Sequence, residues 1–324
     1  MLNLAEHGEL SNKAPLSSVV LGASGFLGAA LVQQLSKMGH RVVAVSRNFH
    51  RKDYDSEPLV TRMIGDIRVQ SVLENACAGA NVVFHAAAST HPTLNLFDPT
   101  AEIEMALLPL FTVMDAAARC GVRKIVFPSS GGTIYADQTA ARSEQTAVDP
   151  RTPYAIFKLA SEQLLLSSAD RGGCKVDIYR VANLYGPGQP TRPGQGVLPH
   201  WIAALEARKA LTLFGDGTAE RDYVYINDAA YCMASSCDRL GDTAVYNLGT
   251  GTATSLNQLV ALLRLICDRK FELNKVMARP TDIQSVSLNS EKLLSMLPNF
   301  RWMELKTGLE KCWERARDQS IDQT

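Results

Sequence analysis

The sequence has no excess charge of either sign, because 33 Lys and Arg residues balance 33 Asp and Glu residues. A chain without net positive charge has no general attraction for nucleic acid or an anionic membrane, so we expect neither as a partner. It also lacks an apolar run long enough to cross a membrane, and its first residues lack the charged, apolar and cleavage regions of a signal peptide. These absences predict a cytoplasmic protein, in which a few local arginines can still bind a small anionic molecule.

The cysteines form no recognisable pattern. Seven are scattered along the chain without a Cys-x-x-Cys pair, which argues against a disulfide framework. We therefore expect reduced thiols in a cytosolic protein and assign no metal site. The remaining composition, 46% hydrophobic and 20% charged over 324 residues, is that of a globular protein with one large domain or two modest ones.

Glycines stand where an apolar run gives way to a helical pattern. Residues 19–21 are typical of a buried parallel strand, and a helical repeat of leucines follows from residue 27. A strand, a glycine turn and a helix N-terminus together present backbone N–H groups to a pyrophosphate. The usual fingerprint spaces its first two glycines by two, whereas here the spacing is three. The predicted cofactor-binding residues of this turn are Gly22, Ser24, Gly25, Phe26, Leu27 and Gly28.

The second expected strand, residues 41–45, is followed by Ser46 and Arg47. In dinucleotide-binding folds this strand end lies beside the adenosine ribose, and an acidic residue there selects NAD. A hydroxyl next to a guanidinium instead accommodates a 2′-phosphate. The cofactor is therefore NAD or NADP, and the Ser46–Arg47 pair favours NADP. The alternative is that Arg47 only covers the adenine.

Two further strand ends complete the expected cofactor site. Asp66 and Ile67 follow the strand at 60–64, where Asp66 either accepts from the adenine amino group or makes a turn. His85 and Ala86 lie in the strand and its exit at 81–88, where small residues let the backbone run against the cofactor. We expect His85 to be packed rather than catalytic.

Hydroxyl groups follow the fifth expected strand, residues 122–127, in the order Pro-Ser-Ser-Gly-Gly-Thr. Tyr154 and Lys158, four residues apart at the start of a later helix, share one helix face. An ammonium beside a tyrosine favours the phenolate, which can take a hydroxyl proton while hydride leaves the same carbon. The candidate catalytic residues are Ser130, Tyr154 and Lys158, with Ser129 and Thr133 as alternatives to Ser130.

In this order, the glycine turn, the Ser129-Ser130 strand end and Tyr154-x-x-x-Lys158 resemble the extended short-chain dehydrogenase/reductases. Within them the chain is most similar to nucleotide-sugar epimerases of the UDP-glucose 4-epimerase type. The resemblance extends from Ser18 to about Arg317. It implies a homodimer formed through the helices near 101–120 and 154–170.

The same resemblance implies a nucleotide-sugar substrate in which the nucleotide is UDP. The implied substrate-binding residues are Ser130, Asn183, Val197, Arg221 and Arg279, with the two arginines on the diphosphate. Val286 lies near the position where the family makes room for a C2 acetamido group. Its modest size predicts that both plain hexoses and N-acetylhexosamines fit.

The implied reaction is epimerisation at C4 through a transient 4-keto sugar, with a tightly bound nicotinamide cofactor. Tyr154 removes the proton of the C4 hydroxyl, Ser130 hydrogen-bonds the oxygen, and Lys158 holds the cofactor ribose. Dehydratases of the family carry an Asp-Glu pair where this chain has Gly131-Gly132, which argues against that reaction. Two alternatives stay open: an NADP-dependent 4-ketoreductase of a nucleotide sugar, and a non-catalytic dinucleotide-sensing protein, which would typically lose the Tyr/Lys pair.

The order of elements predicts an α/β fold. Residues 16–179 are expected to form a doubly wound parallel (Rossmann) sheet with helices on both faces. Residues 180–317 are expected to form mainly a smaller C-terminal substrate lobe, interleaved with the sheet.

Overall fold

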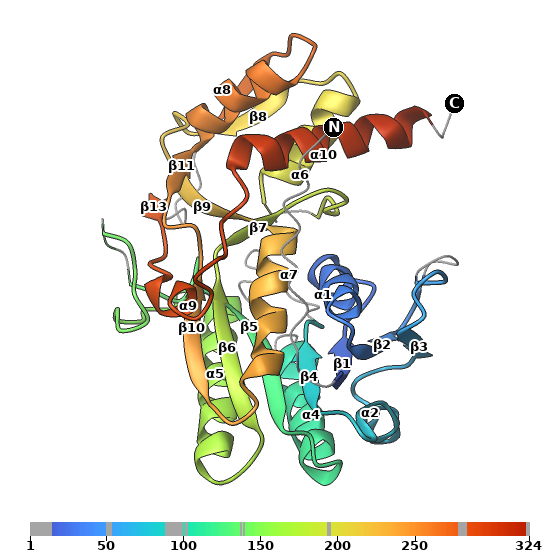
Figure 1. Cartoon of the computed structure of the whole chain (residues 1–324). Helices are drawn as coiled ribbons and strands as arrows, with labels where there is room; N and C mark the ends of the chain where they lie inside the picture. Colours follow the sequence, from blue (N-terminus) through green and yellow to red (C-terminus); the bar gives the residue numbers. More distant parts are fainter. Residues whose placement is uncertain are drawn as a thin grey trace.

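A seven-stranded parallel sheet forms the centre of the molecule (Figure 1). The computed structural model describes residues 15–49, 54–87, 100, 103–136, 138, 140–192, 196–277 and 284–321. The strand order is β10-β6-β5-β4-β1-β2-β3. From β1 the chain adds β2 and β3 on one side and then β4, β5 and β6 on the other, as in doubly wound dinucleotide-binding folds. The predicted fold class is therefore confirmed. The strands are β1 (Ser17–Leu21), β2 (Arg41–Ser46), β3 (Val60–Ile64), β4 (Val82–His85), β5 (Lys124–Ser130), β6 (Lys175–Val181) and β10 (Ala244–Leu248).

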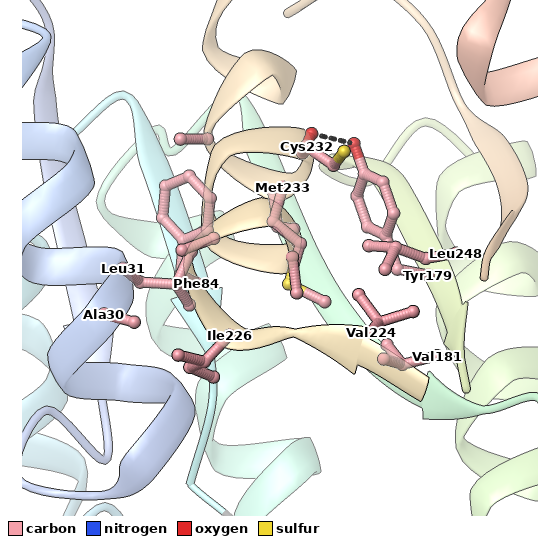
Figure 2. Close-up of a cluster of buried hydrophobic side chains, with 14 of the residues drawn as sticks. Ala30, Leu31, Phe84, Tyr179, Val181, Val224, Ile226, Cys232, Met233 and Leu248 are labelled. Atoms are coloured by element: carbon pink, nitrogen blue, oxygen red, sulfur yellow. Dashed lines mark hydrogen bonds between the residues drawn. The ribbon is translucent and has the colours of Figure 1, made fainter. Parts of the chain in front are cut away.

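Successive residues of a strand point to opposite faces of the sheet, and both faces are apolar. Helices therefore cover both faces, and each face has its own apolar cluster. From β1, Val20 packs in the cluster that contains α1 (Phe26–Lys37) and α7 (Ile226–Ala234), part of which is drawn in Figure 2. Val19 and Leu21 pack in the cluster that contains α2 (Gln70–Cys77), α4 (Leu108–Arg119) and α5 (Pro153–Asp170). A π-helical turn, η1 (Ile103–Leu107), precedes α4. Strands buried on both faces account for the continuous apolar runs in the sequence.

A smaller lobe is built beyond the carboxyl ends of β6 and β10, because both strands run directly into it (Figure 1). β7 (Asn183–Tyr185) follows β6, β11 (Ala253–Ser255) follows β10, and both pair with β9 (Glu220–Tyr225). β9 also pairs with β13 (Ser285–Val286). Since β10 and α7 lie with the large sheet, the two parts of the chain interleave. In the described ranges, none of the helices has the length and apolarity that a membrane span requires.

The outer part of the lobe has its own apolar core. It is enclosed by β8 (Leu211–Phe214), β12 (Leu273–Val276), α6 (Leu198–Glu206), α8 (Leu256–Ile266) and α10 (Leu305–Ile321). The short helices η2 (Ser235–Asp238) and α9 (Glu291–Leu294) complete the described elements.

Asp228 connects α7 to the segment that leads into α10. Its buried carboxylate accepts a hydrogen bond from the backbone N–H of Met303 at 2.6 Å. Burial raises the pKa of Asp228 from 3.8 to about 6, and the Met303 hydrogen bond opposes only part of that shift. The folded protein therefore binds this proton more tightly than the unfolded chain does, and stability is lost as the pH rises through that window.

Asp228→Asn keeps an oxygen acceptor for Met303 but cannot ionise. We expect its free energy of unfolding, relative to the native protein, to increase as the pH rises from 3.8 to about 6 and to stay level above. Urea unfolding at a series of pH values measures this difference. A difference that does not change with pH would contradict the assignment.

Candidate active site

The turn after β1 is packed so closely that two of its glycines, Gly22 and Gly28, have no room for side chains. Gly22 has φ +80°, and a Cβ there would lie 2.6 Å from the Cα of Ala87, just after β4. A Cβ on Gly28 would lie 2.1 Å from the carbonyl oxygen of Gly22, so the first turn of α1 rests on the strand exit. Gly25, the N-cap of α1, supplies no side-chain cap. The first N–H groups of α1 therefore have no acceptor in the helix. Together with the glycine turn they form a cradle of backbone donors, which fits the pyrophosphate of a dinucleotide.

At the end of β2, two hydroxyl groups meet beside a cation. The Oγ atoms of Ser24 and Ser46 are 2.6 Å apart, which joins the glycine turn to β2, and Arg47 is exposed at the next position. Asp66, after β3, accepts the backbone N–H of Arg68 at 2.9 Å and so makes a turn. The Arg68 guanidinium, with a lesser contribution from the charge of Arg47, holds the pKa of Asp66 at about 2.

The Lys158 ammonium joins α5 to the end of β5. It donates to the carbonyl oxygen of Pro128 at 2.9 Å and lies 5.9 Å from the centre of the Tyr154 ring. His85, at the end of β4, is buried, with its ring centre 5.9 Å from that of Phe127. Burial and then the charge of Lys158 lower the pKa of His85 to about 3, so this imidazole is neutral at physiological pH. The cation beside the ends of β4 and β5 is therefore Lys158 of α5, close to the Tyr154 ring.

The three hydroxyl groups at the end of β5 have different partners. Ser129 is buried and donates to the carboxylate of Glu162 on α5. Ser130 is half-buried, and its Oγ accepts from the Thr133 hydroxyl at 2.9 Å. Because the Thr133 proton occupies one lone pair of Ser130, the Ser130 proton can be donated to a ligand.

The first of the two glycines after Ser130 leaves no place for a side chain, so an acidic pair does not fit there. A Cβ on Gly131 would lie 2.9 Å from the carbonyl oxygen of Arg180 and 2.5 Å from a methyl group of Leu288. A Cβ on Gly132 would lie 3.9 Å from the side-chain nitrogen of Asn183. The loop after β5 is thus in close contact with the exit of β6, which leads into the smaller lobe.

Three of the residues expected near the substrate come together around β9. Asn183 starts β7, and its amide donates to the carbonyl oxygen of Asp222 at 3.2 Å. Val286 on β13 is the register partner of Arg221 on β9. Arg221 is half-buried, and its Nη1 donates to the backbone oxygen of Glu220 at 2.7 Å. This sheet therefore places a neutral donor, a guanidinium and a small apolar side chain in one part of the lobe.

The other predicted residues are spread over both parts. Phe26 and Leu27 form the first turn of α1, Ala86 follows β4, and Ile67 follows Asp66. Val197 is the N-cap of α6 and packs against the apolar core of the lobe. Arg279 lies outside the described residues.

Two side chains next to these residues escaped the sequence analysis. Tyr54, at φ 63°, donates its hydroxyl proton to the carbonyl oxygen of Ala23 at 2.6 Å and so ties the segment after β2 to the glycine turn. Asp222 is fully buried and accepts the N–H groups of Thr250 at 2.9 Å and Gly251 at 3.0 Å. Asp222 directly follows Glu220 and Arg221 in β9, so the sequence gives no sign that it is buried, and nothing local marks Tyr54 either.

Taken together, the pyrophosphate cradle after β1, the hydroxyl donor at the end of β5 and the lysine–tyrosine pair of α5 lie at the carboxyl ends of the parallel strands. A tyrosine beside an ammonium is suited to take the proton of an alcohol, and the cradle fits a nicotinamide dinucleotide that accepts the accompanying hydride. The arrangement is therefore suited to oxidation and reduction at a hydroxyl-bearing carbon.

Comparison with known proteins agrees with this chemistry. The model of the NAD dependent epimerase/dehydratase family matches residues 18–249. The chain is 32% identical over 314 residues to the UDP-glucose 4-epimerase of Mycolicibacterium smegmatis, covering 94% of this chain and 100% of that protein. Its structure is similar to that of the Thermotoga maritima UDP-glucose 4-epimerase with UDP-glucose, at a TM-score of 0.85 and 26% identity over 94% of this chain and 100% of that one. It is also similar to the Thermus thermophilus UDP-glucose 4-epimerase in complex with NAD, at a TM-score of 0.82 and 25% identity over 93% and 99%. The family resemblance seen in the sequence is confirmed, and the chain belongs to the NAD-dependent epimerase/dehydratase family.

Proposed function

We propose that the protein is a nucleotide-sugar 4-epimerase that acts through a transient 4-keto sugar. The observation that carries the proposal is the tyrosine–lysine pair on α5 beside the β5 strand end, in a chain whose glycine turn fits a dinucleotide. The lack of space for a side chain at Gly131 supports an epimerase over a dehydratase. Relatives named UDP-glucose 4-epimerase that match the chain over nearly its whole length give further support.

In this reaction Tyr154, as the phenolate, takes the proton of the sugar C4 hydroxyl. Ser130 donates a hydrogen bond to the same oxygen, and the Thr133 proton on Ser130 Oγ sets the direction of that bond. Lys158 holds the cofactor ribose and, as a cation near the Tyr154 ring, favours the phenolate. The bound nicotinamide supplies a hydride acceptor and donor at C4. After the keto sugar has turned over, the opposite face of C4 would take the hydride back, and Tyr154 returns the proton to the same oxygen.

Residues 180–317 mainly hold the nucleotide and leave the sugar free to rotate. Arg221 and Arg279 are assigned to the diphosphate, Asn183 adds a neutral donor, and Val197 lies against the base. Val286, paired with Arg221 across β13 and β9, is assigned to the C2 side of the sugar. Its small side chain leaves room for an acetamido group.

The test is incubation of the purified protein with UDP-glucose or UDP-N-acetylglucosamine without added nucleotide, followed by chromatographic separation of the C4 epimers. We expect the galacto form from both substrates, and a loss of at least about 100-fold in Tyr154→Phe, because a positioned acid–base group contributes about that much. Activity on UDP-glucose alone would contradict the assignment of Val286. No conversion, with NADPH consumed only on a 4-keto sugar, would identify the 4-ketoreductase instead. A dinucleotide-sensing protein would show neither activity.

The cofactor is a nicotinamide dinucleotide, and we favour NADP over NAD because the hydroxyl groups of Ser24 and Ser46 meet at the end of β2, where the ribose is expected, and the exposed Arg47 follows Ser46. A 2′-phosphate there would receive charge-assisted hydrogen bonds from the guanidinium. The relative whose structure was solved with NAD shows that the family also uses the unphosphorylated form.

Arg47→Ala is expected to weaken NADP binding by about 10-fold or more, since a hydrogen bond to a charged group contributes about 1.5–3 kcal/mol. NAD binding should change by less than about twofold, because NAD has no 2′-phosphate. Cofactor titration of the native protein, this variant and Arg41→Ala, an exposed arginine at the other end of β2, measures both affinities. Equal binding of NAD and NADP by the native protein would overturn the preference.

A second copy of the chain is the proposed partner for the outer faces of α4 and α5. Leu108 is 52% exposed, Phe111 48% and Ile156 48%, although these helices cover the same face of the sheet. Exposed apolar side chains that gather on neighbouring helices are typical of a subunit interface.

The seven free thiols fit a reducing compartment, and we place this homodimer in the cytoplasm, which cell fractionation tests.

Phe111→Glu should convert the dimer to a monomer in sedimentation equilibrium, because it would bury unpaired charges between the subunits. The matched control is Ile64→Glu, which changes a residue that is 74% exposed on β3, at the far edge of the sheet. A native protein that sediments as a monomer, or an equal effect of the two variants, would contradict the interface.

A further inference from the structure

Glu162 is the third member of a row on α5 that begins with Tyr154 and Lys158. The three residues are four positions apart, so they lie on one side of the helix. The Glu162 side chain is fully buried, yet nothing in the epimerase chemistry uses it. A buried carboxylate is costly unless its partners are fixed, so its contacts identify what it holds.

Glu162 and Lys158 attach two successive residues of β5 to the catalytic helix. The Lys158 ammonium donates to the carbonyl oxygen of Pro128 at 2.9 Å, and the hydroxyl of the following residue, Ser129, donates to Glu162. Side chains alternate along a strand, so Ser130 points to the opposite side from Ser129. The two attachments therefore fix both the position of the strand end and the direction in which Ser130 leaves it.

The Glu162 carboxylate cannot turn away, because Arg180 on β6 binds it with two nitrogens. The Nη2 of Arg180 lies 2.7 Å and its Nε 3.1 Å from Oε2 of Glu162. The register of the sheet supports this pairing, since Arg180 is the β6 partner of Ser129. The ion pair is nearly neutral as a whole, so it adds little negative charge near Lys158.

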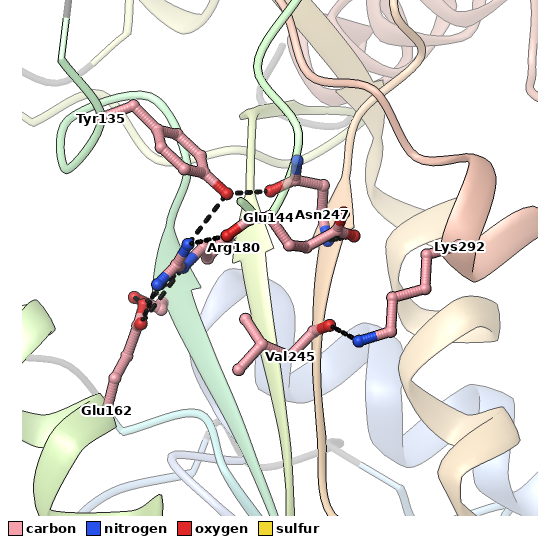
Figure 3. Close-up of polar contacts among 8 residues, drawn as sticks. Tyr135, Glu144, Glu162, Arg180, Val245, Asn247 and Lys292 are labelled. Atoms are coloured by element: carbon pink, nitrogen blue, oxygen red, sulfur yellow. Dashed lines mark hydrogen bonds and ion pairs between the residues drawn. The ribbon is translucent and has the colours of Figure 1, made fainter. Parts of the chain in front are cut away.

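Arg180 is held in turn by Tyr135, which follows β5, and through Tyr135 by Asn247 on β10, as Figure 3 shows. Its Nη1 donates to the Tyr135 hydroxyl at 3.0 Å, and Tyr135 donates to the Asn247 side chain at 2.6 Å. The Asn247 amide donates to the backbone oxygen of Asn289 at 3.1 Å, three residues after Val286. The Ser129–Glu162–Arg180 contacts thus belong to a buried chain of hydrogen bonds that reaches the segment around β13.

We propose that Ser129 and Glu162 are positioning residues that set the place of the Ser130 hydroxyl relative to Tyr154 for proton and hydride transfer at C4. The proposal rests on the proposed function, because it assumes that Ser130 and Tyr154 act on the sugar. Neither Ser129 nor Glu162 touches the substrate. Their effect is on the geometry of the reacting groups, so their loss slows the chemical step without weakening the binding of the nucleotide or the cofactor.

Ser129→Ala removes only the hydroxyl that ties β5 to Glu162. We expect kcat to fall by about 10- to 100-fold, because a displacement of about 1 Å at a reacting group has an effect of that order. KM for the UDP-sugar and the amount of bound cofactor should change by less than about threefold, because the residues assigned to bind them are unchanged. The isotope effect with C4-deuterated substrate should increase, because hydride transfer becomes slower relative to product release. A purely structural role would lower the thermal midpoint of unfolding but leave kcat and the isotope effect of the folded enzyme unchanged.

The matched control is Ser161→Ala, which also removes a buried hydroxyl, in this case one on α5. Ser161 donates to the backbone oxygen of Phe157 within the helix and so does not hold β5. We expect this variant to keep kcat within about twofold of the native value. Ser129→Ala should cause no further loss of kcat when it is added to Glu162→Ala, because Glu162→Ala already removes the acceptor of the Ser129 hydroxyl.

The outcomes separate this proposal from the function on which it rests. If Tyr154→Phe is inactive but folded Ser129→Ala keeps the native kcat and isotope effect, the positioning role is wrong and the epimerase assignment stands. If Tyr154→Phe retains full activity, the proposed catalytic function is wrong. If Ser129→Ala raises KM and leaves kcat unchanged, the contact serves substrate binding and the proposal is overturned.

Discussion

The parallel pairing of β5 with β4 and β6 is the constraint on which the candidate active site depends. It brings the Ser129-Ser130 end of β5 beside Arg180 and Val181 of β6, and it places Lys158 of α5 over the Pro128 carbonyl. The glycine turn of β1 lies on the other side of β4, packed against Ala87. A hydroxyl, a tyrosine–lysine pair and a pyrophosphate cradle therefore meet at one edge without any of them having to be adjacent in the sequence.

Much of this arrangement could be predicted because the signals are local. Residues 19–21 are followed at once by the glycine turn and a helix, and Tyr154 and Lys158 are one turn apart on α5. The parallel sheet and the family followed from such short patterns, and both are confirmed. The expectation that the later part of the chain interleaves with the sheet also had a physical basis, since no linker separates the two parts.

The remaining contacts could not be predicted, because they join residues that no spacing relates. Tyr135 and Asn247 are 112 positions apart, and Ser129 and Glu162 are 33 apart. Two adjacent serines in a strand look equivalent in the sequence, and only the packing of α5 shows that Ser129 is bound to Glu162 while Ser130 is paired with Thr133. Tyr54 binds the glycine turn from a loop that carries no recognisable motif.

In the proposed reaction, C4 of the sugar gives up its hydrogen as hydride and receives the same hydrogen back within one turnover. The most direct test is to convert UDP-glucose deuterated at C4 in ordinary water, with no nucleotide added, and to measure the label in the epimer by mass spectrometry or NMR. We expect the product to retain the deuterium at C4. Loss of the label to the solvent, or release of an unlabelled epimer, would contradict it.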